Sequence, residues 1–175
     1  MDTGSLTQTA TSQLVAGLTP DGKLSTLPAH LTITSRDAQS NAGLNMATGD
    51  ITVTGSALNY TGSQNQAQTI ALTAKTGDIN LSGAQTQAAG QIALTTPASL
   101  IHDSLDVTQK AVMQADRFAI NAGNVSNQGG TINQTGSADF TIHTGNFNNQ
   151  GGQLGGNASN LNVCLLYTSP SPRDS

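Results

Sequence analysis

The side chains best suited to acid–base or metal chemistry in this sequence are the adjacent pair His102-Asp103, with Asp106 close behind. An imidazole titrates near neutral pH, and a neighbouring carboxylate can orient it, so such a pair could move protons or hold a metal ion. The pair directly follows the apolar residues Leu100-Ile101. In that position a solvated corner between two elements is the stronger expectation.

The two other histidines offer no partner for such chemistry. His143 stands between Ile142 and Thr144, where an outward position on a strand is expected. His30 precedes the first regular apolar pattern of the chain. Serine is abundant throughout, but no Ser/His/Asp spacing supports a catalytic triad.

Carboxylates provide an enzymatic alternative, that of a polysaccharide lyase or hydrolase. Asp50 and Asp78 each open a similar apolar strand pattern, and glycan-cleaving sites use clustered carboxylates together with a basic side chain. The two aspartates are 28 residues apart, which leaves their alignment open, and Arg36 and Arg117 are remote in sequence. A direct glycan-binding face is a further alternative.

Two motifs resemble known ligand-binding repeats but lack their key features. The run Gly151-Gly152-Gln153-Leu154-Gly155-Gly156-Asn157 is similar to a calcium-binding nonapeptide, yet it lacks the aspartate ligands that Ca²⁺ needs. Thr32-Ile33-Thr34 and Thr52-Val53-Thr54 are similar to ice-binding threonine arrays, but they do not repeat on the main period of the chain, so structural threonine ladders are expected. We therefore predict no catalytic, cofactor-binding or metal-binding residue, no cofactor, and no enzymatic activity.

Composition favours an all-β repeat protein. Of the 175 residues only 9% are charged and 3% are aromatic, and the chain is rich in Gly, Thr, Ser, Asn, Gln and Ala. Such a chain lacks the straight-chain residues that build helices and the large apolar residues that fill a spherical core. The net charge is −4 and the basic residues are scattered, which argues against a nucleic-acid partner. No apolar run approaches the length of a membrane-spanning helix.

The sequence contains a near-duplication with a period of 22 residues. The stretch from Phe118 to Gly130 returns from Phe140 to Gly152, and both copies end in Asn-Gln-Gly-Gly. A fixed period of this length is typical of repeat architectures.

Short alternating apolar pairs extend this repeat along the chain. Period-two alternation between glycines is typical of half-buried strands. The pairs are Leu31/Ile33, Leu44/Met46, Ile51/Val53, Ile70/Leu72, Ile79/Leu81, Ile92/Leu94, Phe118/Ile120, Phe140/Ile142 and Leu161/Val163.

Equivalent positions are expected to recur about every 22 residues, with two insertions of four residues. We take these positions as Leu44, Ile70, Ile92, Phe118, Phe140 and Leu161. About 22 residues make two or three short strands with turns, too few for a βαβ unit. We therefore predict a right-handed parallel β-helix of about six rungs.

The chain divides into three parts. Residues 1–30 are expected to form an irregular leader or a partial rung, and residues 31–163 the β-helix repeats. Residues 105–116 are expected to hold an insertion, with one helical turn as a possibility. Residues 164–175 contain the only cysteine and resemble the translation of a transposase-type sequencing adapter, so we expect an artefactual, disordered tail. Both natural ends of the protein are then expected to lie beyond this sequence.

The repeats resemble those of filamentous haemagglutinin-type exoproteins. The resemblance rests on Asn121–Ile132 and its copy at Asn146–Leu154, and it covers about residues 31–163. That family comprises large adhesins, haemolysins and contact-dependent inhibition toxins of Gram-negative bacteria. The resemblance implies export through an outer-membrane transporter of the two-partner type, folding outside the cell, and a secreted or cell-surface location.

The expected function is that of a structural shaft segment. Such a segment presents a binding or effector region of a large adhesin or toxin away from the cell surface. Its expected partners are the rest of its own longer chain, the outer-membrane transporter, and a host or neighbouring cell surface. The family's secretion domain and toxin domains are not recognisable here, so their activities cannot be assigned to any residue of this chain.

Overall fold

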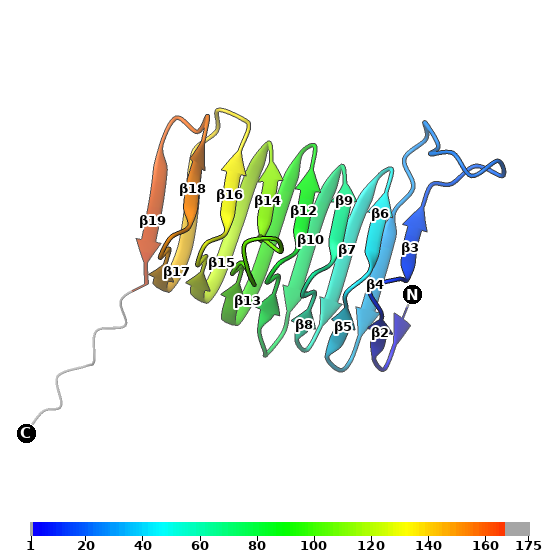
Figure 1. The fold of residues 1–175 in the computed structure, drawn as a ribbon, viewed down its shortest axis with the longest axis horizontal. Helices are drawn as coiled ribbons and strands as arrows, with labels where there is room; N and C mark the ends of the chain where they lie inside the picture. The colour runs from blue at the N-terminus through cyan, green and yellow to red at the C-terminus, as the bar shows by residue number, and fades with distance from the viewer. Residues whose placement is uncertain (1, 167–175) are drawn as a thin grey trace, which may run out of the picture.

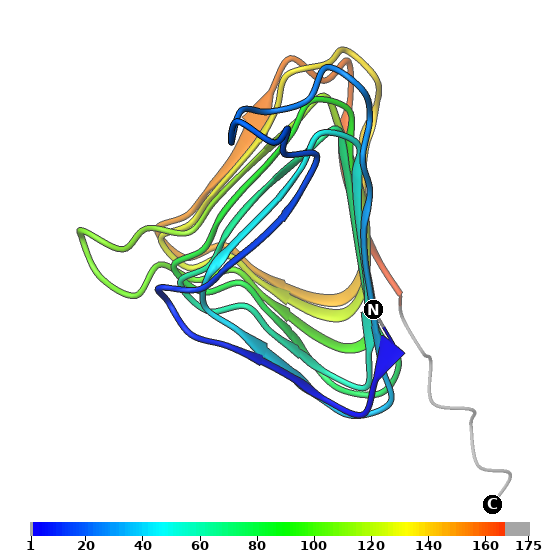
Figure 2. The ribbon, with the colours of Figure 1, turned by 90° about the vertical axis from the view of Figure 1, so that its right-hand side faces the viewer.

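The computed structural model describes residues 2–166, and the chain winds through them as a stack of three-sided coils (Figures 1 and 2). Nineteen strands and no helix occur in this range, and every pairing between named strands is parallel. Seen along the stack, the cross-section is a triangle (Figure 2). The predicted parallel β-solenoid is confirmed.

The first side of the triangle, here called face 1, holds the first strand of each coil. Its strands are β1 (Asp2–Thr3), β4 (Leu31–Ser35), β7 (Asp50–Gly55), β10 (Thr69–Ala74), the first halves of β13 (Gln91–Ile101), β15 (Arg117–Ser126) and β17 (Phe140–Asn148), and β19 (Leu161–Leu165).

Face 2 follows face 1 around the coil. Its strands are β2 (Leu6–Gln8), β5 (Gln39–Asn41), β8 (Leu58–Asn59), β11 (Ile79–Asn80) and the second halves of β13, β15 and β17. Face 3 is a separate sheet that closes the triangle. Its strands are β3 (Gln13–Ala16), β6 (Leu44–Ala47), β9 (Gln64–Ala67), β12 (Gln85–Ala88), β14 (Val112–Ala115), β16 (Thr131–Gln134) and β18 (Gln153–Gly156).

Six complete coils run from β4 to β18, in agreement with the predicted number of rungs. An additional coil formed by β1, β2 and β3 lies within residues 1–30, and its strands pair in register with β4, β5 and β6. Residues 17–30 then leave the stack as a protruding loop (Figure 1). Part of the predicted leader is therefore regular solenoid.

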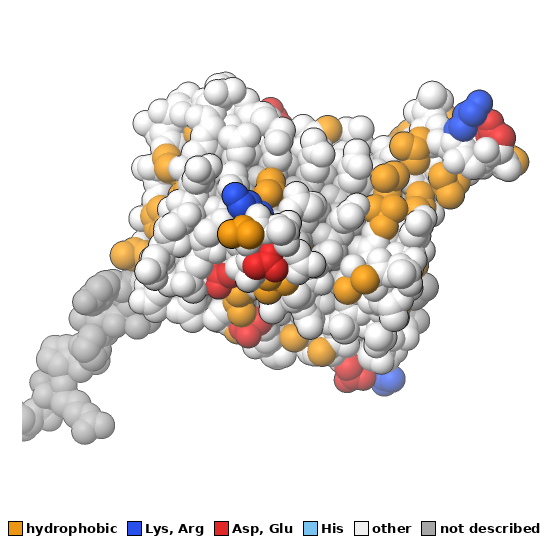
Figure 3. Space-filling view, in the orientation of Figure 1, with side chains coloured by type: hydrophobic (Ala, Val, Ile, Leu, Met, Phe, Trp, Pro, Cys, Tyr) orange, Lys and Arg blue, Asp and Glu red, His pale blue; other side chains and the backbone are white. Residues whose placement is uncertain are grey.

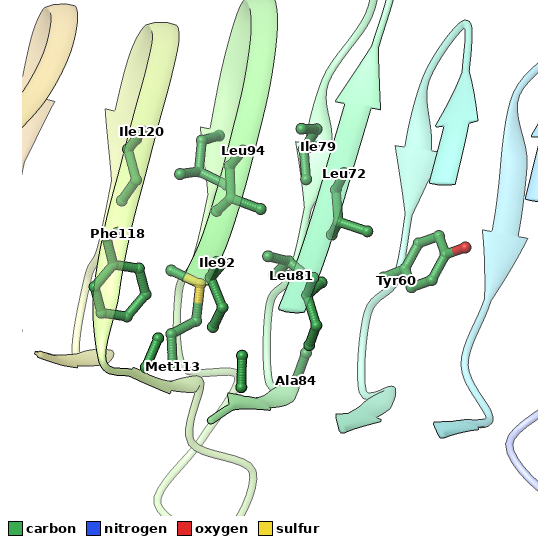
Figure 4. Close-up of a cluster of buried hydrophobic side chains, with 14 of the residues drawn as sticks. Tyr60, Leu72, Ile79, Leu81, Ala84, Ile92, Leu94, Met113, Phe118 and Ile120 are labelled. Carbon is green, nitrogen blue, oxygen red and sulfur yellow. The ribbon is translucent and has the colours of Figure 1, made fainter. Parts of the chain in front are cut away.

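Two continuous columns of apolar side chains fill the interior behind face 1. Strand alternation directs every second residue inward, and in-register pairing places each such residue over its equivalent in the next coil. Phe118 and Phe140 stack with their ring centroids 5.1 Å apart. Figure 4 shows part of this interior. The columns are Leu31, Ile51, Ile70, Ile92, Phe118, Phe140 and Leu161, and Ile33, Val53, Leu72, Leu94, Ile120, Ile142 and Val163.

One predicted pair belongs to a different face. Leu44 pairs with Gln64 on face 3, and the residue equivalent to Ile70 is Ile51. Leu44 and Met46 are half-buried outward residues, while Asn45 between them points inward. Because Leu44 and Met46 are apolar, the sequence pattern wrongly assigned them to inward positions equivalent to Ile70 and Leu72. The long spacing from Leu44 to Ile70 then suggested the first of the two predicted insertions, which the structure does not contain.

The second predicted insertion is real, but it contains no helical turn. Ile92 pairs with Phe118, a spacing of 26 residues, and residues 103–110 project as an irregular loop (Figure 2). Asp106 organises this loop, because its Oδ1 accepts hydrogen bonds from the backbone N–H groups of Thr108 and Gln109. Such an Asx turn competes with helical hydrogen bonding.

The predicted tail overlaps the last strand. Cys164 and Leu165 lie in β19, where they pair with His143 and Thr144. Residues 167–175 lie outside the described part of the chain. The boundary at residue 164 stays a prediction.

The Asn-Gln-Gly-Gly motif forms the corner between faces 2 and 3. Gly129 has φ of 64° and its copy Gly151 has φ of 65°, a conformation that glycine adopts without steric cost. The Asn127 side chain turns inward and donates through Nδ2 to the carbonyl of Gly130 at 3.2 Å. A Cβ on Gly130 would overlap both the Asn127 Oδ1 and the His102 carbonyl oxygen. The second glycine is therefore required by close packing between coils.

We predict that Gly130→Ala destabilises the solenoid by about 1–3 kcal/mol, the usual cost of overpacking. Gly155→Ala is the matched control, since a Cβ there meets no atom within 4 Å. The measurement is chemical denaturation of both variants followed by circular dichroism. Equal midpoints for the two variants would contradict the packing assigned to this corner.

Candidate functional site

A stack of inward side chains lines the corner between faces 2 and 3, and it includes the buried side chains of Tyr60 and His102. Each member follows or ends the face 2 portion of its coil, and the pairing of that face puts the members in register. Together they form the corner stack, which consists of Gln8, Asn41, Tyr60, Leu81, His102, Asn127 and Asn149.

His102 is fully buried in the corner stack, which corrects the expected solvated corner. Asn127 Nδ2 donates to the Oδ1 of Asn149 at 2.7 Å, so its own Oδ1 is turned to the imidazole. The His102 Nδ1 lies 2.7 Å from that oxygen and therefore donates to it. The His102 Nε2 has no hydrogen-bond partner among the described residues.

Burial strongly affects the titration of this imidazole. Desolvation lowers the pKa of His102 to about 4, and the hydrogen bond that His102 donates to Asn127 and the charge of Asp103 offset only part of that effect. The ring is therefore neutral at physiological pH. Its surroundings are those of a packed structural histidine, without access for a substrate.

The neighbouring carboxylates accept hydrogen bonds from nearby backbone N–H and hydroxyl groups. Asp103 Oδ1 accepts from the Ser126 hydroxyl and from the backbone N–H of Gln128, both at 2.7 Å. Asp106 lies on the protruding loop, where the hydrogen bond from the Thr108 side chain lowers the pKa of its carboxyl. His102, Asp103 and Asp106 thus do not converge on one site.

A second polar network fills the interior behind face 3, and the sequence pattern did not predict it. Asn65 Oδ1 accepts from the Nδ2 of Asn45 at 2.8 Å, and its Nδ2 donates to the Ser63 and Thr86 hydroxyls at 2.9 and 3.1 Å. Asn45 is also hydrogen bonded to Asn41. All five side chains are buried. A buried amide without partners costs about 1–3 kcal/mol, so the network satisfies itself from coil to coil.

Tyr60 connects this network to face 1. Its hydroxyl donates to the Gln39 Oε1 at 3.1 Å, and Gln39 Nε2 donates to the Ser35 hydroxyl at 2.9 Å. Burial raises the pKa of the Tyr60 phenol, so the group stays a neutral donor. A sequence signal for the polar interior does exist, because Gln64-Asn65-Gln66-Ala67 returns as Gln85-Thr86-Gln87-Ala88 with the same small residue at its end.

The carboxylates proposed for a lyase or hydrolase lie at different corners. Asp50 begins face 1, where its Oδ1 accepts from the Thr69 hydroxyl at 2.6 Å. Asp78 lies between β10 and β11 and accepts from the backbone N–H of Ser99 at 2.9 Å. Among residues 2–166, no group of three or more His, Cys, Asp or Glu side chains is placed to hold a metal ion.

The remaining candidates occupy outward positions or loops. His143 is exposed on β17, as predicted, and pairs with Asn121 and Cys164. His30 Nδ1 accepts from the backbone N–H of Asp50 at 3.0 Å, in the loop before β4.

The threonine triplets form ladders, as expected. Thr32 pairs with Thr52, and Thr34 pairs with Thr54. The second column continues through Thr73 and Thr95. The coil at this point has 20 residues, which is why the 22-residue period did not detect the alignment.

A comparison with curated proteins supports the resemblance of these repeats to those of secreted exoproteins. Over 135 residues, or 77% of this chain, the sequence is 37% identical to Toxin CdiA of Yersinia pestis. The stacked coils and the Asn-Gln-Gly-Gly corners are those expected of the repeats named above. This chain is a filamentous haemagglutinin-type repeat segment.

The segment spans about 4% of the length of that relative. No family model matches the sequence, and no solved structure matches it significantly. Within residues 2–166, no helix is long and apolar enough to cross a membrane.

We predict that His102 makes the stability of the repeat segment depend on pH. The folded pKa of about 4 lies below the ordinary value of 6.5, so the unfolded chain binds more protons between these values. The free energy of unfolding should be highest above about pH 6.5 and fall as the pH approaches 4, by about 3 kcal/mol in total.

His102→Asn should remove this slope, since asparagine would extend the Asn127 and Asn149 column without titrating. His143→Asn, on the exposed face, is the control and should retain it. Urea denaturation at several pH values measures the effect. A His102→Asn variant with the wild-type slope would show that other groups are responsible.

Proposed function

We propose that this repeat segment is a rigid spacer in the shaft of a large secreted bacterial adhesin or toxin. It presents a binding or effector region away from the cell surface and performs no catalysis of its own. The observation that carries the proposal is the unbroken stacking of inward columns from coil to coil. Six coils at about 4.8 Å each extend roughly 25–30 Å.

The exposed face of the last strand supports continuation of the shaft. Leu161 and Val163 belong to the two inward columns behind face 1, yet they are 47% and 37% exposed because no coil covers them in this structure. Their apolar side chains match the interior of one more coil. We infer that the neighbouring part of a longer chain stacks on β19.

The similarity to Toxin CdiA supports the proposed biological setting. The relative is about 25 times longer than the matched stretch, since that stretch is 4% of its length. We propose that the parent of this chain is a contact-dependent inhibition protein or a related adhesin of a Gram-negative bacterium. Its export requires an outer-membrane transporter of the two-partner type, and its partners are on host or neighbouring cells.

The internal duplication allows a direct test of the spacer role. Deletion of residues 118–139 removes one coil and brings Phe140 into the place of Phe118. We expect the shortened chain to fold with an unchanged cross-section and to lose about 4.8 Å of length. Circular dichroism and small-angle X-ray scattering measure these two properties. Deletion of residues 129–139, which removes only the face 3 part of that coil, is the control and should abolish cooperative folding.

The same in-register deletion tests the function when it is placed in the parent exoprotein. A spacer predicts that target-cell binding or inhibition stays within about twofold of the undeleted protein, a change of less than 1 kcal/mol. Complete loss of that activity, with secretion and folding intact, would assign a specific role to this coil and overturn the proposal.

Export through a transporter gives a second prediction. Ala71 and Ala93 are in-register neighbours on face 1, so a disulfide between Ala71→Cys and Ala93→Cys is compatible with the strand spacing. In the parent exoprotein, a disulfide formed before export would close a loop that obstructs threading. We expect the double variant to accumulate in the periplasm and each single variant to be secreted normally. Added reductant should restore secretion. Normal secretion of the oxidised double variant would contradict export in an unfolded state.

A further inference from the structure

The outer surface of face 3 carries a groove between the two protruding loops. Residues 17–30 overhang one end of this face, and residues 103–110 project beside its middle (Figures 1 and 3). Two adjoining hollows of about 410 and 360 Å³ lie between them. They share Met46, Gln66 and Gln87, so they form one groove across successive coils.

Glutamine amides line the floor of the groove. Gln66, Gln87 and Gln114 pair in register as one outward column, and Gln64 and Gln85 begin a second. Gln85 Nε2 donates to the carbonyl of Lys110 at 2.6 Å. The other four amides have no hydrogen-bond partner among the described residues. Each of them offers two donors and one carbonyl acceptor to a ligand.

The remaining lining mixes apolar residues with uncharged polar ones, among them Asn65, Gln68 and Thr48. Leu44, Met46 and Val112 lie beside the glutamine columns. Leu24, on the overhanging loop, adds an apolar wall at one end. In Figure 3, hydrophobic side chains gather in an orange patch beside the protrusion on the right, and the surface between the two protrusions is mostly white. None of the residues that line the two hollows is charged, so the lining itself offers no countercharge to an ionic ligand.

We infer that this groove binds a linear, uncharged glycan that lies along the long axis of the solenoid. Hydroxyl groups both donate and accept hydrogen bonds, as the free amides do, and the C–H faces of sugars can rest on Leu44, Met46 and Val112. The glutamines recur at the coil repeat of about 4.8 Å, so successive sugars of an extended chain would meet equivalent side chains. This function is additional to that of a spacer.

The test uses the 175-residue chain and isothermal titration calorimetry. The probes are hexamers of β-1,4-glucan, β-1,3-glucan, α-1,4-glucan and β-1,4-mannan, with hexagalacturonate as the charged comparison. We expect saturable binding of at least one neutral hexamer and weaker binding of hexagalacturonate. The double variant Gln66→Ala/Gln87→Ala should lower the affinity by about tenfold or more, whereas Gln128→Ala/Gln150→Ala, a glutamine pair at a corner outside the groove, should leave it unchanged.

Circular dichroism of both variants verifies that the fold is retained. The inference is overturned if no neutral hexamer binds, if hexagalacturonate binds as tightly, or if the two double variants behave alike. It is also overturned if sedimentation reveals self-association that Gln66→Ala/Gln87→Ala abolishes while glycan binding is unaffected. In that case the occupant of the groove is a second copy of this chain.

Discussion

The structure depends on in-register parallel pairing between coils. The backbone hydrogen bonds of the strands join one coil to the next, so a strand side chain lies over its equivalent one coil away. An inward column must therefore be compatible with itself along its whole length. Ile, Leu and Val satisfy this requirement by stacking, and Phe118 on Phe140 does so with two aromatic rings.

The same constraint explains how this solenoid tolerates polar side chains in its interior. An asparagine has both a donor and an acceptor, so a column of asparagines can satisfy itself without water. Asn45 with Asn65, and Asn127 with Asn149, are hydrogen bonded in this way. His102 lies where such a polar column meets Leu81, which cannot supply a partner on that side. The His102 Nε2 has no hydrogen-bond partner among the described residues.

Once the interior is used for stacking, other functions must be placed on outward residues and corners. The outward columns vary without changing the stack, as the threonines of face 1 and the glutamines of face 3 show. Corners accept insertions, and residues 17–30 and 103–110 are the two largest. Because only the inward residues must stack, the outer surface of such a spacer can vary in sequence. The same separation of inward and outward roles is consistent with the positions of Asp50 and Asp78 at different corners and of His102 in the interior.

The sequence by itself determined the fold class, the approximate period and five of the six equivalent core positions, because the strands of face 1 alternate between apolar and polar residues. Leu44/Met46 was the pair placed wrongly, since Ile51/Val53 fills that position. The alternation of apolar and polar residues did not reveal the strands of face 3. In Gln64-Asn65-Gln66 the inward and the outward residues are all polar, and only contact with neighbouring coils buries Asn65. The tertiary structure likewise decided the burial of His102 and the convergence of the glutamines, since both depend on which residues of other coils lie above and below.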